Sequence, residues 1–188
     1  MGTIRAIAAG LVAAPVMITC MDVFGYVAKV EGASMQPCLN PDPKTPTTDY
    51  VFLNRWKVRS YEFTRGEVVS LTSPTNPDQK IIKRIIGLEG DKVRTLSYKN
   101  RNIKVPKGHC WVEGDHHGQS LDSNLFGPVA MGLILAKASH IVWPPSRWQR
   151  LEAKMPSGRV SVRKDFHNIS DISNKDLNIA IEEVLDES

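Results

Sequence analysis

Ser34 lies in the segment 31–37, Glu-Gly-Ala-Ser-Met-Gln-Pro, where two small residues come just before it, directly after a stretch of β-type sequence. Small neighbours give a substrate backbone room to approach a serine hydroxyl, and Pro37 interrupts regular structure just beyond it. A serine in a loop is usually only a loop residue, so this segment by itself is weak evidence for a nucleophile. A nucleophilic serine also needs a nearby base to accept its proton.

The segment 80–87, Lys-Ile-Ile-Lys-Arg-Ile-Ile-Gly, offers a candidate base. In a strand, Lys83 shares a face with Ile81 and Ile85, while Arg84 lies on the opposite face. A buried lysine loses its proton readily and an arginine does not. To act near neutral pH, the lysine pKa must fall about 3 units from about 10.4, and isoleucine neighbours favour such a fall. Alternatively, Lys83 reaches water and Arg84 pairs with an acid, and the segment alone favours this second interpretation.

Residues 114–127 form a third candidate segment, dense in polar and turn-forming residues, which predicts a long hydrogen-bonded loop. His116 and His117 suggest a metal site, but their spacing fits no zinc pattern, so we predict no metal. A Ser-His-Asp triad built from Ser34 or Ser120 is also conceivable, although no nucleophile elbow accompanies it.

The composition excludes several classes of protein. The 188 residues are 41% hydrophobic and 23% charged, which rules out wholesale disorder and coiled-coil chains. Three scattered cysteines are too few for a disulfide framework, and whether Cys38 pairs with Cys110 stays open. Residues 29–150 hold 18 basic and 11 acidic side chains. This excess would also suit a non-enzymatic β-barrel module that binds anionic lipid or RNA, but the low aromatic content of 7% argues against RNA.

The elements that must position these residues are short strands. Runs of β-branched and aromatic residues separated by turn sequences predict a mainly β, antiparallel barrel or sandwich. The expected strands are 26–30, 50–53, 67–72, 80–86, 92–97, 102–105, 109–112 and 139–143. Residues 129–137 are ambiguous between strand and helix.

The two ends of the chain differ from this body. Residues 6–21 carry no charge, and the stretch reaches a membrane-spanning length if it extends to Ala28. A cleaved secretory signal, a mitochondrial presequence or a buried helix are the alternatives. We therefore divide the chain into a membrane anchor at 1–28, a β-rich domain at 29–150 and an acidic tail at 151–188. The tail contains a possible short helix at 174–186.

The three candidate segments, in this order, resemble the type I signal peptidase family, membrane-anchored serine proteases that use a Ser–Lys dyad. Residues 65–69, 83–91 and 114–123 look like three further motifs of that family. The resemblance covers residues 26–150 and is closer to the mitochondrial inner membrane protease branch, in particular its subunit 2. The closer match lies in the sequence motifs at 30–37, 111–118 and 143–148.

The resemblance implies a signal-peptidase-like β-barrel or coiled sheet with an N-terminal membrane helix. It implies Ser34 as nucleophile and Lys83 as general base, with Ser120 holding the lysine amine and Asp122 organising the loop. The Ser34 amide would donate to the oxyanion. Gly32 occupies the position of a side-chain oxyanion donor in some relatives, and Asn124 stands where bacterial members usually have an arginine paired with the aspartate.

For substrate contacts we expect Met35, Ile81 and Ile85, and we expect no cofactor. The resemblance further implies a single-pass protein of the mitochondrial inner membrane with its catalytic domain in the intermembrane space. Its partners would be a homologous subunit 1, inner membrane lipid and precursor proteins with cleavable presequences, and not nucleic acid. Two other interpretations remain: a non-catalytic scaffold subunit, or a self-cleaving Ser–Lys peptidase of the repressor type, which normally brings a helix-turn-helix domain.

Overall fold

The computed structural model describes residues 13–15, 19, 23–41, 48–156 and 159. The predicted helix at 174–186 and most of the apolar stretch at 6–21 lie outside these residues. Ala13, Ala14, Pro15, Thr19, Val23 and Phe24 have helical backbone. Within the described part of the chain, no helix is both long enough and apolar enough to cross a membrane.

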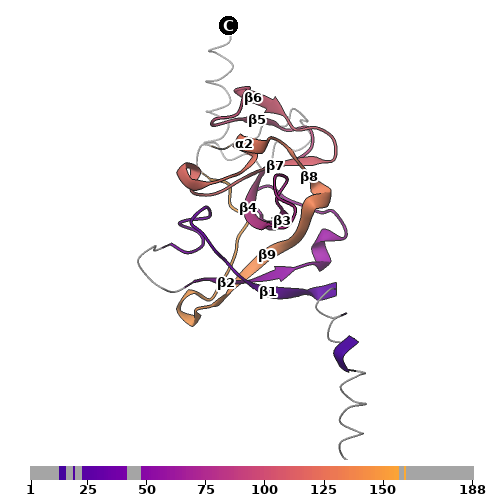
Figure 1. The fold of residues 1–188 in the computed structure, drawn as a ribbon, viewed down its shortest axis with the longest axis vertical. Helices are drawn as coiled ribbons and strands as arrows, with labels where there is room; N and C mark the ends of the chain where they lie inside the picture. The colour runs from indigo at the N-terminus through magenta and orange to yellow at the C-terminus, as the bar shows by residue number, and fades with distance from the viewer. Residues whose placement is uncertain (1–12, 16–18, 20–22, 42–47, 157–158, 160–188) are drawn as a thin grey trace, which may run out of the picture.

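The fold is mainly β and antiparallel, as the sequence predicted. One curled sheet runs in the order β1-β2-β9-β3-β4-β7-β8, and every neighbouring pair is antiparallel (Figure 1). Its strands are β1 (Gly25–Lys29), β2 (Tyr50–Asn54), β3 (Val68–Thr72), β4 (Lys80–Gly87), β7 (His109–Glu113), β8 (Val129–Ala130) and β9 (Ile134–Trp143). A short strand, β10 (Gln149–Arg150), pairs with β9. The hairpin of β5 (Lys92–Arg94) and β6 (Asn102–Lys104) forms a separate ribbon at the end of the molecule opposite β1.

Helical structure within the described residues is limited to single turns between strands, apart from the isolated helical residues before β1. The turns are η1 (Trp56–Val58), η2 (His117–Gln119), α2 (Ser123–Phe126), η3 (Met131–Leu133) and η4 (Pro145–Arg147). The segment 129–137, ambiguous in the sequence, divides into β8, η3 and the first part of β9. Gly132 falls in the turn between the two strands, where it interrupts the β-type run.

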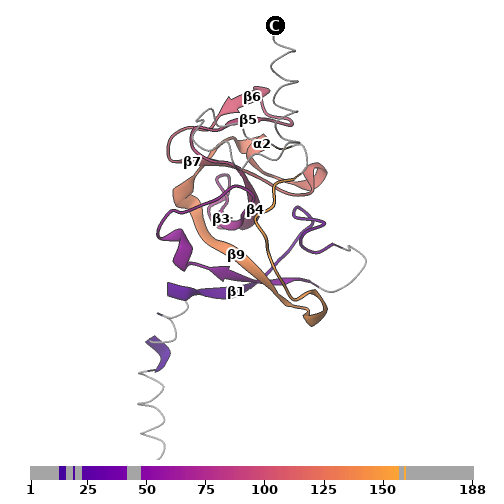
Figure 2. The same ribbon diagram turned by 180° about the vertical axis from the view of Figure 1, so that it is seen from behind.

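The strand β9 connects the two halves of the sheet. Its first residues pair with β3, its later residues pair with β2, and its C-terminal part also pairs with β10. It crosses the body of the molecule diagonally when seen from either side (Figure 2). Alternate β9 side chains are buried, and they contribute to two hydrophobic clusters, one at each half of the sheet. Such alternation is what a half-buried antiparallel strand requires.

The two predicted domain boundaries fall inside folded structure. β1 begins at Gly25, so the residues from there to 28 belong to the sheet. At the other end, Leu151 is buried in the core cluster that contains Met35 and Leu39. Residues just beyond position 150 therefore pack on the β body and are not part of a separate tail.

Candidate active site

Lys83 is buried on β4, where only 3% of its surface is exposed. Its Nζ donates a hydrogen bond of 3.0 Å to Ser120 Oγ. Burial lowers the pKa of Lys83 because the charged ammonium loses water, while the carboxylates of Asp122 and Asp115 oppose that fall. Lys83 is therefore predisposed to become a neutral amine.

Arg84, the next residue, faces the other side of the strand and is fully paired. Its guanidinium binds the Asp115 carboxylate through two hydrogen bonds of 2.7 and 2.6 Å and donates a third, of 2.7 Å, to the carbonyl of Gly66. Both neighbouring cations are thus buried, but only the arginine has an ion-pair partner at hydrogen-bond distance. The predicted pairing of Arg84 with an acid is observed, whereas the expected escape of Lys83 to water is not.

The turn that carries Ser34 is closed by the side chain of Asn40. The Asn40 amide donates to the carbonyl of Val30 at 2.9 Å, and Asn40 and Asp49 exchange backbone-to-side-chain bonds of 2.7 and 2.8 Å. Asn40 has a positive φ of 51°, a conformation that asparagine tolerates better than most residues. These bonds join the two ends of the turn, so its shape does not depend on β1 alone.

Arg147, in η4 after β9, braces the same turn. Its Nε lies 2.9 Å from Asp49 Oδ1, and its Nη2 donates to the carbonyl of Cys38 at 2.9 Å. Sequence reasoning missed the roles of Asn40, Asp49 and Arg147. The sequence pointed to one of them only indirectly, because Arg147 lies in the motif at 143–148 that resembles the family.

The loop after β7 presses directly against the Ser34 turn. The amide of His116 donates to the carbonyl of Ser34 at 3.1 Å. A Cβ on Gly114 would lie 2.3 Å from both the Ser34 carbonyl oxygen and Ser120 Oγ. Only glycine fits here, and its missing side chain lets the backbone of Ser34 and the hydroxyl of Ser120 lie close together.

Asp122 holds this loop from inside. One of its carboxylate oxygens accepts from the Gly114 amide at 3.0 Å, and the other accepts from the Asn124 amide at 3.0 Å and from Asn124 Nδ2 at 3.2 Å. Asn124 Nδ2 also donates to Glu113 Oε1 at 3.0 Å. The asparagine at 124 thus bridges two carboxylates.

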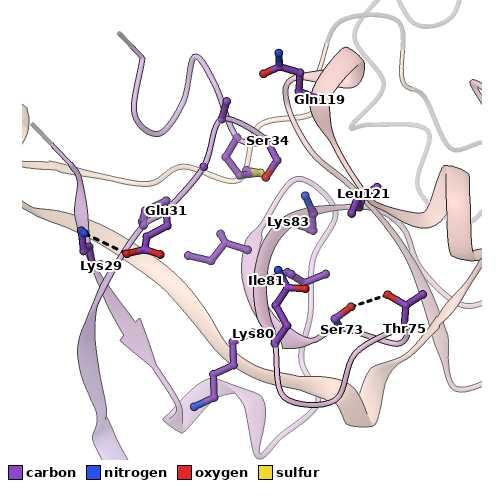
Figure 3. A pocket seen from close by; sticks show the side chains of 16 residues that line it. Lys29, Glu31, Ser34, Ser73, Thr75, Lys80, Ile81, Lys83, Gln119 and Leu121 are labelled. Carbon is purple, nitrogen blue, oxygen red and sulfur yellow. Dashed lines mark hydrogen bonds and ion pairs between the residues drawn. The ribbon is translucent and has the colours of Figure 1, made fainter. Parts of the chain in front are cut away.

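Ser34 and Lys83 line one open cleft of about 460 Å³ (Figure 3). Its walls come from the end of β1 and the Ser34 turn on one side, and from the first half of β4 on the other. Gln119 and Leu121, on either side of Ser120, also line it. In Figure 3 the Lys83 side chain extends from its strand toward the turn that carries Ser34.

The other predicted residues have mixed positions. Gly32 lines the cleft with φ of +85°, and no atom lies within 4 Å of the place where a Cβ would be. Ile81 lines the cleft as well, whereas Ile85 is fully buried in the core behind it and is not among the lining residues. Met35, expected to contact substrate, borders the cleft, but only 2% of its surface is exposed and it packs in the core.

The alternative chemistries find no support in the geometry. No three His, Cys, Asp or Glu side chains of the described residues could hold a metal ion together. His117 is exposed, and the buried His116 Nδ1 has no hydrogen-bond partner in the described part of the chain, so neither forms the bonds of a triad. Cys38 and Cys110 are both free thiols, and burial raises the pKa of Cys110 to about 12.

Comparisons with known proteins identify the family of the chain. The family described as signal peptidase, peptidase S26, matches residues 3–99 and 94–143. A mitochondrial inner membrane protease subunit 2 from Danio rerio is 62% identical over 148 residues, covering 79% of this chain and 80% of the relative. The subunit 2 from Homo sapiens is 58% identical over 154 residues, covering 82% and 87%, and that from Saccharomyces cerevisiae is 41% identical over 152 residues, covering 80% and 85%.

A subunit 1 is also related: the one from Homo sapiens is 38% identical over 138 residues, covering 71% of this chain and 78% of its own. A solved signal peptidase I from Enterococcus faecalis matches 42% of this chain and 97% of its own, with 23% identity and a TM-score of 0.35. The relatives place the chain among the subunits of the mitochondrial inner membrane protease. The chain therefore belongs to the S26 signal peptidase family of serine endopeptidases.

Proposed function

We propose that this chain removes N-terminal sorting peptides from proteins delivered to the mitochondrial intermembrane space, with Ser34 as nucleophile and Lys83 as general base. One observation carries the proposal: Lys83, a buried lysine with a lowered pKa, lines the same cleft as Ser34 and donates a hydrogen bond to the hydroxyl of Ser120. A general base has to be within reach and unprotonated at working pH, and burial favours the second condition because it lowers the pKa of Lys83.

The reaction would proceed in two steps. Neutral Lys83 takes the proton of the Ser34 hydroxyl as its oxygen attacks the scissile carbonyl, and returns that proton to the leaving amine. Water, deprotonated in turn by Lys83, then hydrolyses the acyl-enzyme. Ser120 would keep the amine in one orientation through the 3.0 Å bond, and Asp122 would hold the loop that carries Ser120.

The cleft has the form that an extended peptide needs. From Lys80 to Lys83, β4 pairs with β3 on one side, but β7 joins its other side only from Arg84 onward. β1 is the last strand at its end of the sheet, so its outer edge has no partner strand among the described residues. A substrate could add as a strand to these free edges, and its main chain would then supply most of the affinity.

The same proposal covers location and assembly. The uncharged stretch at 6–21 would anchor the protein in the inner membrane, beside substrates that emerge from it. A homologous subunit 1 would be its partner in a heterodimer, because relatives of this chain are named as subunits 1 and 2 of one protease.

The test is cleavage of peptides that span presequence junctions of intermembrane-space proteins, by the full chain in detergent or nanodiscs, with products identified by mass spectrometry. We expect cleavage at a single bond, and its loss in Ser34→Ala. Ser60→Ala is a matched control, since Ser60 is an exposed serine that only bonds a carbonyl in its own turn. Cleavage that persists in Ser34→Ala would exclude Ser34 as the nucleophile.

The competing function is a non-catalytic scaffold for subunit 1. If the wild-type chain alone cleaves nothing, and Ser34→Ala mixed with subunit 1 cleaves every substrate that wild type mixed with subunit 1 cleaves, the scaffold interpretation holds and the peptidase proposal fails.

A further inference from the structure

Glu113 is a buried carboxylate at the end of β7, with 1% of its surface exposed. Its Oε1 accepts from Trp111 Nε1 at 2.8 Å and from Asn124 Nδ2 at 3.0 Å. Its ion-pair partner is Arg159, whose Nε donates to Oε2 at 2.9 Å and whose Nη2 donates to Oε1. A buried carboxylate that loses its cation strongly destabilises the fold, so this arrangement needs the arginine.

Arg159 reaches Glu113 from the segment that follows the last strand. Leu151 enters the core cluster below the Ser34 turn, and Met155 packs against the cluster that contains Trp111. Between them the backbone crosses Gly66 so closely that a Cβ there would lie 2.8 Å from Lys154 N. Residues 151–156 therefore follow a path fixed by packing, which carries the chain to the buried Arg159, 7% exposed.

Glu113 connects this arginine to the proposed catalytic lysine through the loop. Asn124 joins Glu113 to Asp122, and Asp122 in turn holds the amide of Gly114. Ser120, which receives the hydrogen bond of Lys83, lies between Gly114 and Asp122 in the same loop. Hydrogen bonds and short lengths of backbone therefore connect Arg159 to Lys83 without a break.

We propose that Arg159 is a positioning residue for the peptidase site: by neutralising Glu113, it keeps Asn124 and Asp122 in place and so holds Ser120 against Lys83. The inference rests on the proposed function of Ser34 and Lys83. It assigns a task to the segment after the β body, which the sequence left without one, and it explains how a loop with Asn124 in place of an arginine is held. The cation comes from further along the chain.

The charge of Arg159 should affect the pH dependence of cleavage, which a purely packing role would not. Asp122 and Asp115 from the loop act on the charge of Lys83, and Arg84 is bound to Asp115; Lys29, Glu31 and Lys80 line other parts of the same cleft. Among the described residues, Arg159 is the cation that pairs with Glu113, so its removal leaves an unpaired carboxylate in the network that joins Glu113 to Asp122. The protonated form of Lys83 is then favoured, so its pKa rises and the acidic limb of the pH–rate profile moves to higher pH.

The experiment measures peptide cleavage by the full chain over a range of pH for Arg159→Ala, Arg159→Lys and the double variant Glu113→Gln with Arg159→Ala. We expect Arg159→Ala to lower kcat at neutral pH by about ten- to a hundredfold, because a site displaced by about 1 Å loses that much. We expect its acidic limb to move to higher pH, Arg159→Lys to be intermediate, and the double variant to recover the wild-type limb and most of the activity. Lys154→Ala, which removes one exposed charge from the same segment, should match wild type.

Suppose that Arg159→Ala loses activity without any shift of the acidic limb of its pH–rate profile, and that the double variant recovers no activity. That result would mean that Arg159 is only a structural contact, and would overturn the inference. If Arg159→Ala does not fold, we measure Arg159→Lys alone and combined with Glu113→Gln. The shift of the acidic limb and the recovery of activity in the double variant then decide in the same way. Ser34→Ala is assayed in parallel: cleavage that survives in it refutes the proposed function, whatever the Arg159 variants do. Wild-type behaviour of all Arg159 variants beside an inactive Ser34→Ala refutes the positioning role alone.

Discussion

Lys83 is placed where folding and the proposed chemistry make opposite demands. Its neighbours on the same face of β4 are isoleucines, and its one hydrogen-bond acceptor at close range is the neutral hydroxyl of Ser120. Burying an ammonium in such surroundings disfavours the folded state, whereas a neutral amine there costs less. The adjacent Arg84 carries no such penalty, because Asp115 binds it with two hydrogen bonds.

Replacing Lys83 by methionine should therefore abolish cleavage and stabilise the fold at neutral pH. The pKa of Lys83 is lowered, so between that folded value and the ordinary value near 10.5 the unfolded chain binds more protons, and wild-type stability rises with pH across this window. The gain in Tm from Lys83→Met should be full below the window and shrink as pH approaches 10.5. Thermal melts across pH measure it, with Lys92→Met, an exposed lysine, as control. A lower Tm for Lys83→Met at pH 7 would contradict this account.

In the wild type, the same lowered pKa sets the pH dependence of activity. Because the proposed base works only when unprotonated, kcat/KM should rise with pH through an acidic limb that lies below the ordinary pKa of lysine.

At the scale of elements, the site depends on one close approach between the Ser34 turn and the loop after β7. Gly114 permits that approach, since any side chain at this position would collide with the Ser34 carbonyl and the Ser120 hydroxyl. The backbone φ of Gly114 is not in the positive range, so a substitution there acts through space alone.

Gly114→Ala should therefore separate the two elements, with a fall in kcat of about a hundredfold, the size expected for a displacement of about 1 Å. Gly118→Ala, in the same loop, is the matched control: its Cβ would meet only His116 Cε1, at an ordinary 3.8 Å, and activity should stay close to wild type. Steady-state cleavage kinetics compare the two variants. Equal activities would show that the loop can move aside without consequence for catalysis.

The strands that carry this site were readable from the sequence, because the side-chain alternation of a strand is local. Ile81, Lys83 and Ile85 share a face of β4 as their spacing predicted, and the eight expected strands all correspond to observed ones. The bracing by Arg147 was not readable, since it contacts Cys38 from 109 positions away, and the bonds between Asn40 and Asp49 depend on a turn geometry that no local pattern predicts. The burial of Met35 was missed for the same reason: the core that covers it includes β9 and Leu151.

At the scale of the whole molecule, Leu151 and Arg159, which follow β10, contact the two elements that form the site. Leu151 packs in the cluster that lies under the Ser34 turn, where Met35 and Leu39 are also buried. Arg159 reaches the loop after β7 through Glu113. The Ser34 side and the Ser120 side of the cleft are therefore both supported by one stretch of chain that was expected to be a separate tail.

If that stretch is part of the folded body, Leu151→Ala should destabilise the protein by about 2–5 kcal/mol, the usual cost of truncating a buried leucine. Leu125→Ala is the matched control, since Leu125 is 64% exposed and its truncation removes little buried surface. Chemical denaturation of the two variants gives the comparison. If the stretch were a detachable tail, Leu151→Ala would lower the free energy of unfolding as little as Leu125→Ala does. Leu151 would then give no support to the Ser34 turn. Because Leu151 also packs with residues of that turn, we expect the destabilised variant to lose kcat at temperatures below its Tm, whereas Leu125→Ala should retain it.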